Sequence, residues 1–352
     1  MAEATKPAVR TDLQMCLPFE RPVFELERKL EELMTLSAQT AMNLNGELKP
    51  LLEKRDRMLR EIVAGLGPWE RVQIARHPRR PQFRDYVLGE PGRPGVPPVA
   101  AMIDEWIELH GDRTFGDDRA ISTGLARMGP YRFMLIGHRK GRETKEKLAC
   151  NFGCAHPEGY RKALLKMKMA ERFGLPVVAL INTPGAYPGI GAEERGQAWA
   201  IAENILEMSA LKVPTICIVI GEGGSGGALG IGIGDRVLML EHAYYSVISP
   251  EGCAAILWKS GEKAAEAARA LRLTSEDLLR LKVVDGVVKE PLGGAHRNPA
   301  AMVATLKDVL LATLKELTEM DPEERMAQRY ARLRALGNDL EPLDPPAPPP
   351  EA

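Results

Sequence analysis

Apolar side chains recur with a helical period in the first 66 residues of the chain. Two runs place them three or four positions apart: Val23, Leu26, Leu30 and Leu33, then Leu48, Leu52, Leu59 and Ile62. Such a stripe is typical of an amphipathic helix. Arg55 interrupts the second run, and Asn45-Gly46 predicts a turn between the two. We therefore expect a helical hairpin, which either packs on its own domain or serves as an arm for dimerisation or for docking a partner protein.

The middle of the chain has a different pattern, in which short apolar runs alternate with amphipathic stretches. The apolar runs cover residues 132–138, 176–182 and 213–220. The amphipathic stretches have two apolar faces: Tyr160, Ala163, Leu164, Met167, Ala170 and Phe173, then Ala198, Ile201, Ala202, Ile205 and Met208. Strands that are apolar on both faces and alternate with helices predict an α/β fold, in which helices cover a buried and largely parallel sheet.

Glycine and proline mark the segments between and beyond these elements. Residues 89–98 are "GEPGRPGVPP", which indicates an exposed loop, and the C-terminal "EPLDPPAPPPEA" is typical of a disordered or polyproline-like tail. From these changes we predict three parts: a helical arm over 1–66, a core over 67–305, and C-terminal helices with a proline-rich tail over 306–352.

The composition narrows the possible classes of function. Of 352 residues, 47 are basic and 48 acidic, so the overall charge does not favour nucleic-acid binding. No apolar run approaches the roughly 20 residues of a membrane span, and the first residues lack the apolar core of a secretory signal. The five cysteines are odd in number and scattered, which suits a reducing compartment. We expect a cytoplasmic protein without membrane contact.

One segment, "CNFGCAH", raises the question of a metal site because it places Cys150, Cys154 and His156 close together. A structural zinc ion normally has four ligands with tighter pairing. We therefore expect buried or incidental thiols and no metal in this chain.

Two glycine-rich turns follow consecutive predicted strands, "NTPGAYPGIG" at 182–191 and "GEGGSGGALG" at 221–230. In parallel sheets, ligands collect outside the carboxyl ends of the strands. A helix that starts there presents unpaired N–H groups and a partial positive charge. The pattern predicts two sites for an anion or a developing oxyanion. An alternative is close packing of a glycine-faced helix on the sheet, which would account for Gly230, Gly232 and Gly234.

Two other motifs compete for the second turn. Residues 221–226 fit G-x-G-x-x-G, and Glu241 ends the next strand as in dinucleotide-binding oxidoreductases, but few residues remain for the helix that such a unit needs. Residues 223–227 fit the G-x-S-x-G of a serine hydrolase, with Asp285 and His296 downstream. There the following helix is too rich in glycine to support a strained nucleophile turn.

Five blocks of the sequence resemble, in order, the alpha subunit of bacterial acetyl-CoA carboxylase carboxyltransferase. They lie between about residues 20 and 335 and include 137–167, 182–197, 220–235, 245–260 and 291–299. A resemblance of this extent does not depend on one short motif. It implies the crotonase fold, a spiral of ββα units related to the α/β class predicted above.

The resemblance also implies a reaction and its participants. The family moves the carboxyl group of carboxybiotin to the methyl carbon of acetyl-CoA and forms malonyl-CoA for fatty acid biosynthesis. Biotin is carried by a separate biotin carboxyl carrier protein, and ATP is used by the biotin carboxylase component. Two alpha and two beta subunits form a heterotetramer with active sites at alpha–beta interfaces, and the beta subunit holds the zinc ion.

Residue by residue, the resemblance assigns backbone donors in both turns. Gly226 and Gly227 match the family's oxyanion residues, and Gly185 and Ala186 match the companion turn. We expect this chain's donors to face biotin, while the donors to the thioester lie largely on the partner. Leu229 stands where hydratases of this fold have a catalytic glutamate, which argues against a hydratase because adding water requires a positioned acid or base.

The remaining candidates bind substrate rather than stabilise charge. Tyr187, Gly224 and Ser225 belong to the two turns. Lys140 and Arg142, in the basic stretch "HRKGRETKEK", could meet the phosphates of coenzyme A or the acidic surface of the carrier protein; a solvated charged edge is the alternative.

Overall fold

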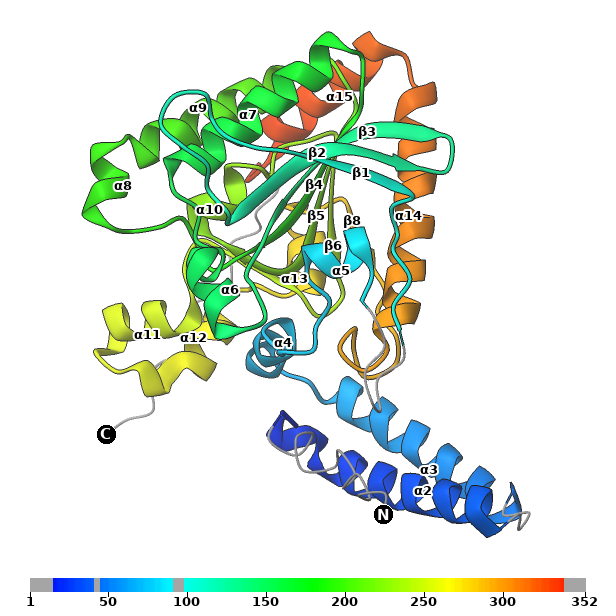
Figure 1. Ribbon diagram of the computed structural model, residues 1–352. Coiled ribbons are helices and arrows are strands. Elements are labelled where there is room, and N and C mark those ends of the chain that lie inside the picture. The colour runs from blue at the N-terminus through cyan, green and yellow to red at the C-terminus, as the bar shows by residue number, and fades with distance from the viewer. Residues whose placement is uncertain (1–14, 41–44, 91–97, 339–352) are drawn as a thin grey trace.

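The computed structural model describes residues 15–40, 45–90 and 98–338, which form a helical hairpin beside a larger body built on one sheet (Figure 1). Within these residues the sheet has eight strands: β1 (Glu105–Leu109), β2 (Ile121–Met128), β3 (Tyr131–His138), β4 (Val177–Thr183), β5 (Thr215–Gly224), β6 (Arg236–Leu240), β7 (Tyr244–Ser246) and β8 (Gly286–Val288). Their order is β1-β2-β3-β4-β5-β6-β8, and β7 pairs with the end of β5. β2 is antiparallel to both β1 and β3, and the other pairings are parallel.

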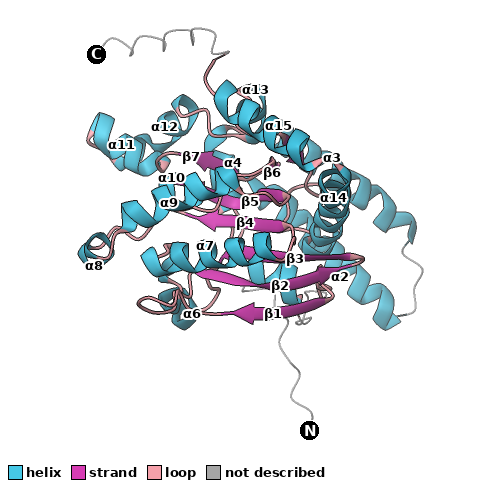
Figure 2. Cartoon of the chain, turned by 90° about the horizontal axis from the view of Figure 1, so that it is seen from above, coloured by secondary structure: helices cyan, strands magenta, loops and turns pink. Residues whose placement is uncertain are grey.

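The predicted α/β class is confirmed, because the three predicted apolar runs form β3, β4 and β5. Every residue of β4 and β5 is buried, as expected for strands covered on both faces. Two long helices, α7 (Pro157–Arg172) and α9 (Gln197–Ala210), lie side by side over the sheet (Figure 2). The two C-terminal helices, α14 (Pro299–Glu319) and α15 (Pro322–Ala335), are also present. None of the described helices is both long enough and apolar enough to cross a bilayer.

Shorter helices fill the connections. They are α4 (Pro68–Ala75), α5 (Phe83–Leu88), α6 (Thr144–Ala149), α8 (Ile190–Glu194), α10 (Ser225–Leu229), α11 (Pro250–Trp258), α12 (Ala264–Ala270) and α13 (Ser275–Arg280), with 3-10 turns η1 (Pro18–Glu20), η2 (Asn151–Gly153) and η3 (Gly261–Lys263). Most of the predicted 89–98 loop and the whole C-terminal "EPLDPPAPPPEA" segment lie outside the described residues. The boundaries proposed at 66 and 305 stay predictions.

The predicted face of α9 is wrong by part of a turn. Ala198 and Ala202 are exposed, whereas Asn204 is completely buried. The Asn204 amide donates to the carbonyls of Tyr160 and Gly230, at 3.0 and 2.8 Å. Both N–H groups of the amide are thereby paired, which offsets much of the cost of burial, although Oδ1 has no partner among the described residues. This face therefore includes a residue that hydrophobicity alone excludes. The prediction for α7 holds except at Phe173, which follows the helix and is exposed.

The end of β5 also differs from the prediction. The strand was expected to stop at Ile220, but it continues to Gly224 because Glu222, Gly223 and Gly224 pair with β7. The first glycines of the cluster are therefore strand residues, and the turn into α10 comes later.

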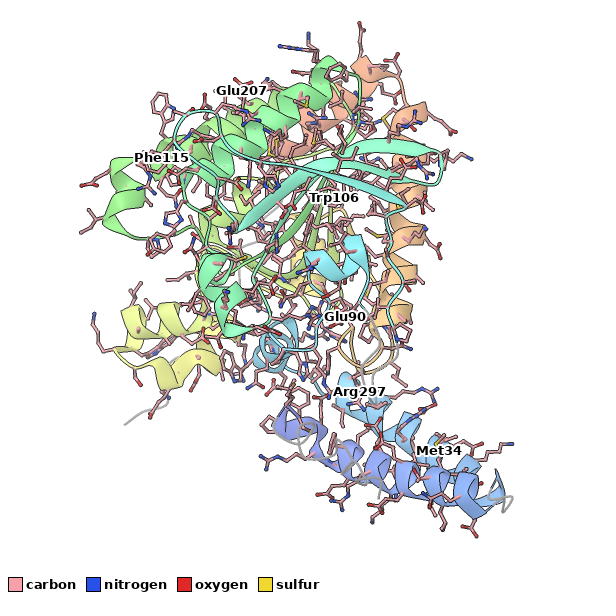
Figure 3. All side chains as sticks on the ribbon, in the orientation of Figure 1. Met34, Glu90, Trp106, Phe115, Glu207 and Arg297 are labelled. Atoms are coloured by element: carbon pink, nitrogen blue, oxygen red, sulfur yellow. The ribbon has the colours of Figure 1, made fainter. Side chains whose placement is uncertain are left out.

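The N-terminal arm consists of α2 (Arg21–Thr40) and α3 (Asn45–Ala64), so both predicted helices are confirmed. The expected turn is misplaced, because Asn45 and Gly46 begin α3, and residues 41–44 lie outside the described chain. The arm joins the body through Arg297, which pairs with Glu20 and Glu27 (Figure 3). Its start therefore packs on its own chain, while Met34 further along α2 is exposed.

Candidate active site

The two glycine-rich turns lie against each other at one edge of the sheet. β4 and β5 are parallel neighbours, so the turns that leave Thr183 and Gly224 emerge at the same edge, as the sequence predicts. A Cβ atom on Gly227 would lie 2.5 Å from the amide nitrogen of Ala186, and one on Gly224 would overlap the carbonyl of Pro184. The two turns are therefore in direct backbone contact.

This contact changes the explanation for the glycines. Close packing, which was predicted for Gly230, Gly232 and Gly234 alone, also accounts for Gly224 and Gly227. The glycines allow one turn to approach the other, and substrate access is not needed to explain them.

Two glycines of the turns have other environments. Gly185 has open space around its Cβ position but a φ of +155°, which favours glycine. At Gly226 the nearest atoms to an added Cβ are those of Ile201, at 3.7 Å, so an alanine fits there.

Several backbone N–H groups at this edge have no acceptor. Gly226 and Gly227 lie in the first turn of α10, where N–H groups have no intrahelical partner. Among the described residues no backbone or side-chain acceptor pairs with the N–H of Gly226, Gly227 or Ala186. Gly185 differs, because its N–H donates to Thr183 Oγ1 at 3.1 Å. The expectation that Gly185 supplies a free donor is therefore wrong.

The first turn is held in place by contacts with Ala155 and His156, which precede α7. The Tyr187 N–H donates to the carbonyl of Ala155 at 3.0 Å. The side-chain amide of Gln197 donates to the carbonyl of Ala155 and to that of Tyr187. The His156 ring stacks on the Tyr187 ring with centroids 4.1 Å apart, and the buried Asp118 carboxylate accepts from the His156 backbone at 2.8 Å. The sequence analysis assigned no role to Asp118 or to Gln197, the last residue of block 182–197, because contacts with distant segments leave no local pattern.

The competing motifs do not form their sites. Ser225 has a φ of +52°, so the expectation that the glycine-rich helix cannot support a strained turn is wrong. However, His296 pairs with Glu20 at 2.9 Å and Asp285 with Arg332 at 2.6 Å, so neither serves Ser225. The dinucleotide interpretation fails because α10 has only five residues.

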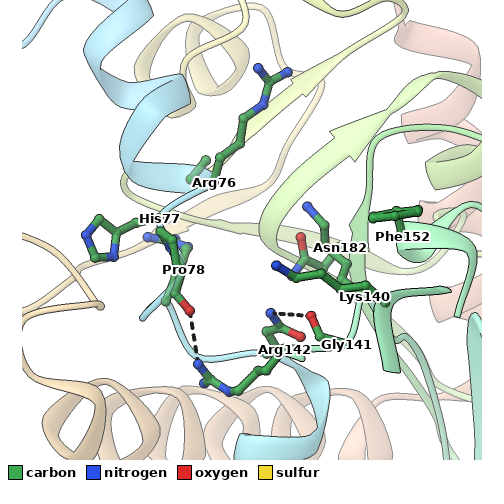
Figure 4. Close-up of a pocket in the computed structure, with 12 residues that line it drawn as sticks. Arg76, His77, Pro78, Lys140, Gly141, Arg142, Phe152 and Asn182 are labelled. Carbon is green, nitrogen blue, oxygen red and sulfur yellow. Dashed lines mark hydrogen bonds between the residues drawn. The ribbon is translucent and has the colours of Figure 1, made fainter. Parts of the chain in front are cut away.

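A cavity of about 200 Å³ lies between α4 and the ends of β3 and β4, and Asn182 of β4 is the one residue of segment 182–191 in its described lining (Figure 4). Its lining includes five cationic side chains, from Arg76, Arg80, Lys140, Arg142 and Lys147. No Asp or Glu is among the described residues that line it. Lys140 and Arg142 therefore lie together at a cavity lined by cationic side chains, and their role in binding stays a prediction.

The carboxylates that balance these cations lie behind the lining. Glu222, which is buried, pairs with Lys140 and accepts from Arg76 Nε at 2.7 Å and from Tyr244 Oη at 2.7 Å. Arg142 pairs with Asp85 and donates to the carbonyl of Pro78.

The protonation of Lys140 is finely balanced. Burial, and secondarily the neighbouring Arg76 guanidinium, lower the pKa of Lys140 to about 7, whereas its contact with Glu222 favours the charged form. An anion in the cavity would add to the effect of Glu222.

Two groups of described residues bring possible metal ligands within 4.8 Å of one another: Glu20, His77 and His296, and Asp118, His156 and Glu158. In the first group His77 Nε2 already bonds to the carbonyl of Met15 at 2.8 Å, and Arg297 neutralises Glu20. In the second, Glu158 pairs with Arg161 and Arg195. Cys150 and Cys154 belong to neither group.

Comparison with known proteins gives a consistent result. A family model described as acetyl co-enzyme A carboxylase carboxyltransferase-like matches residues 16–337. Relatives named acetyl-coenzyme A carboxylase carboxyl transferase subunit alpha include one from Rhodopirellula baltica, 54% identical over 92% of this chain and 98% of its own length. Another, from Escherichia coli, is 53% identical over 91% of this chain and 98% of its own length.

Solved structures with similar folds come from other carboxyl-transferring enzymes. Transcarboxylase 12S aligns with a TM-score of 0.52 and 19% identity over 62% of this chain, which spans 40% of that chain. The beta subunit of Pseudomonas aeruginosa geranyl-CoA carboxylase aligns with a TM-score of 0.51 and 17% identity over 78% of this chain and 51% of its own. At these identities the likeness shows the fold, which is the predicted crotonase-like one.

Proposed function

The chain belongs to the acetyl co-enzyme A carboxylase carboxyltransferase-like family, and from this we propose that its paired turns supply one half of a site that transfers a carboxyl group from carboxybiotin to acetyl-CoA. The observation that carries the proposal is the group of unpaired N–H donors, at Gly226, Gly227 and Ala186, where two backbones meet at the carboxyl edge of the sheet. The oxidoreductase and serine hydrolase alternatives are not supported by the family or by the site.

Donors of this kind match the charge that the reaction creates. When the carboxyl group leaves biotin, negative charge develops on the ureido oxygen. Preorganised N–H groups stabilise such charge without reorganising, and removing one typically costs about 2.7–4 kcal/mol of barrier. Since the Gly185 N–H is paired internally, Ala186 is the donor that we assign to the companion turn.

The other residues of the turns have supporting roles in this proposal. Gly224 brings the turns together, and the left-handed Ser225 directs the chain into α10. Tyr187, which is stacked on His156, holds the companion turn in place. Lys140 and Arg142 attract the anionic groups of the substrates toward the cavity.

We also propose the partners that the family implies. A zinc-containing beta subunit completes the site in a two-alpha two-beta assembly, which works with the biotin carboxyl carrier protein and with the ATP-using biotin carboxylase. Large exposed apolar side chains beyond the turns support a protein partner: Ile190, Trp199, Val247, Ile256 and Leu257. In the shared site this chain binds and orients the biotin group. The transferred carboxyl group arrives on the biotin of the carrier protein.

The experiment that tests this function is reconstitution. The chain and a beta subunit, mixed, should convert malonyl-CoA and biocytin to acetyl-CoA and carboxybiocytin, and either protein alone should be inactive. Activity of the isolated chain would contradict the shared site, and an inactive mixture with a confirmed complex would contradict the proposed function.

A further inference from the structure

The 3-10 turn before α7 has an unusual backbone. Three consecutive residues, Asn151, Phe152 and Gly153, have positive φ values of +46°, +55° and +89°. For an aromatic residue this conformation is unfavourable, and it persists only when the surroundings enforce it.

The surroundings of the turn do enforce it. Thr183 Oγ1, at the end of β4, donates to the carbonyl of Gly153 at 2.7 Å. Backbone bonds close the turn on both sides, from Gly153 to Cys150 at 2.8 Å and from Cys154 to Asn151 at 2.9 Å. The Asn151 amide lies 3.1 Å from His156 Nδ1. The strained segment is thereby tied to the strand that leads into the first glycine-rich turn.

The strain does not serve to bury the Phe152 ring. Phe152 is 53% exposed, so the chain keeps both a strained backbone and an apolar ring in water. The ring lines the cationic cavity, opposite Arg76 and beside Lys140 and Asn182 (Figure 4). Phe152 thus combines a strained backbone with an exposed apolar ring, and both place the ring at the cavity. This combination indicates a role in binding.

We propose that Phe152 is a positioning residue for the biotin side of the reaction, whose ring packs on the bicyclic ring of biotin while the carboxyl group faces the cations of the cavity. This inference rests on the proposed function and adds a contact to it. A cavity of about 200 Å³ is smaller than the roughly 300–1,000 Å³ of sites that enclose a whole small molecule. It suits the head of a ligand, and coenzyme A has no compact ring beside the acyl group that could meet Phe152.

The test compares kinetic constants for the two substrates in the assembled alpha–beta complex. Phe152→Ala should raise the KM for biocytin at least fivefold and leave the KM for malonyl-CoA within twofold of the wild-type value. Phe152→Tyr, which keeps an aromatic ring, should have the wild-type KM for biocytin. Phe173→Ala, at an exposed phenylalanine beyond α7, serves as the matched control and should change neither constant. Unchanged KM values in Phe152→Ala, or a rise for malonyl-CoA alone, would overturn the inference.

A second variant separates a functional role from a structural one. Glycine adopts a φ of +55° without strain, so Phe152→Gly should melt at the same temperature as the wild type or higher, yet bind biocytin as weakly as Phe152→Ala. A lower melting temperature with an unchanged KM for biocytin would show that the ring only supports the fold.

Direct binding distinguishes failure of this inference from failure of the proposed function. If the wild-type complex transfers no carboxyl group, the proposed function fails, and saturation-transfer NMR of the biocytin ring protons still decides the inference. A signal that Phe152→Ala weakens at least twofold supports the contact. An equal signal in both proteins, or none in the wild type, contradicts it.

Discussion

The two ends of strand β5 each carry a buried ion pair, and the two pairs are built differently. At the start of the strand, Arg329 of α15 meets Asp235, which also accepts from Thr215 N–H. All five N–H donors of Arg329 are paired, with both Asp235 oxygens and with the carbonyls of Met208, Leu211 and Val213. At the other end, Glu222 holds Lys140 and Arg76 beside a cavity.

The difference separates a structural charge from one available for binding. Arg329 is 1% exposed and has no donor left, so its cluster can only hold α15 on the body. Lys140 also pairs with a buried carboxylate, that of Glu222, but it lines a cavity, and no Asp or Glu is among the described residues of that lining. Burial of a charge is therefore no sign of function by itself; the informative feature is whether donors stay directed at an open space.

The largest effect is expected at the closed end. Arg329→Leu breaks the buried pair with Asp235, which keeps the Thr215 N–H and, at 3.7 Å, Arg325 as partners. Breaking such a pair typically costs about 3–5 kcal/mol, and the free energy of urea unfolding should fall by that amount. The exposed pair of Arg127 with Glu105 gives the control, since Arg127→Leu should change the free energy of unfolding far less. A loss at Arg329 as small as at Arg127 would remove the distinction between the clusters.

The next effect is expected where the turns meet. Gly227→Val pushes a side chain into the backbone of Gly185 and Ala186 and should lower kcat at least about 100-fold in the alpha–beta complex. The melting temperature of the complex is measured alongside, to show that the variant is folded. Turnover near the wild-type rate would exclude the contact between the turns from the mechanism.

A smaller effect is expected at the open end of β5. Lys140→Met removes one charged hydrogen-bond donor from the cavity, which corresponds to about 1.5–3 kcal/mol, or roughly 10–100-fold in kcat/KM. It should lower the free energy of unfolding less than Arg329→Leu does, because Glu222 keeps Arg76 and Tyr244 as partners. A variant that is unstable but has normal kinetics would make Lys140 a structural residue.

The same lysine predicts a pH dependence. Since the pKa of Lys140 is lowered to about 7, its charge is lost as the pH rises through that value, and kcat/KM for an anionic substrate should fall above it. Lys140→Arg, which keeps its charge, should abolish the fall. A decline that persists in that variant belongs to another group.

The smallest effect is expected at Gly226. Its Cβ position is free, so Gly226→Ala should alter kcat less than about threefold, because the added methyl group moves neither turn and leaves the N–H donor in place. A loss comparable to that of Gly227→Val would mean that substrate approaches Gly226 more closely than we propose.

The sequence predicts the frame of the site well and its side-chain partners poorly. Continuous apolar runs identified β3, β4 and β5, and their shared direction placed both turns at one edge. The same patterns could not show that Glu222 in the glycine cluster meets Lys140, because 82 residues separate them and neither belongs to a periodic face.

The sequence could not predict local backbone geometry either. The left-handed Phe152 has no sequence signal, since phenylalanine does not favour that conformation and bonds such as the one from Thr183 to Gly153, 30 residues away, hold it in place. Buried Asn204 was missed for a related reason, because its carbonyl partners come from two distant segments. Tertiary hydrogen bonds therefore decided what periodicity could not.

The central claim is that main-chain N–H groups of this chain bind the oxygen on which charge develops. A crystal structure of the alpha–beta complex with biocytin tests it most directly. We predict that the ureido oxygen lies within about 2.7–3.1 Å of the amide nitrogens of Gly226 and Gly227, the distance at which such donors act. An ureido oxygen bound away from both turns, or bound there only by side chains, would contradict the account.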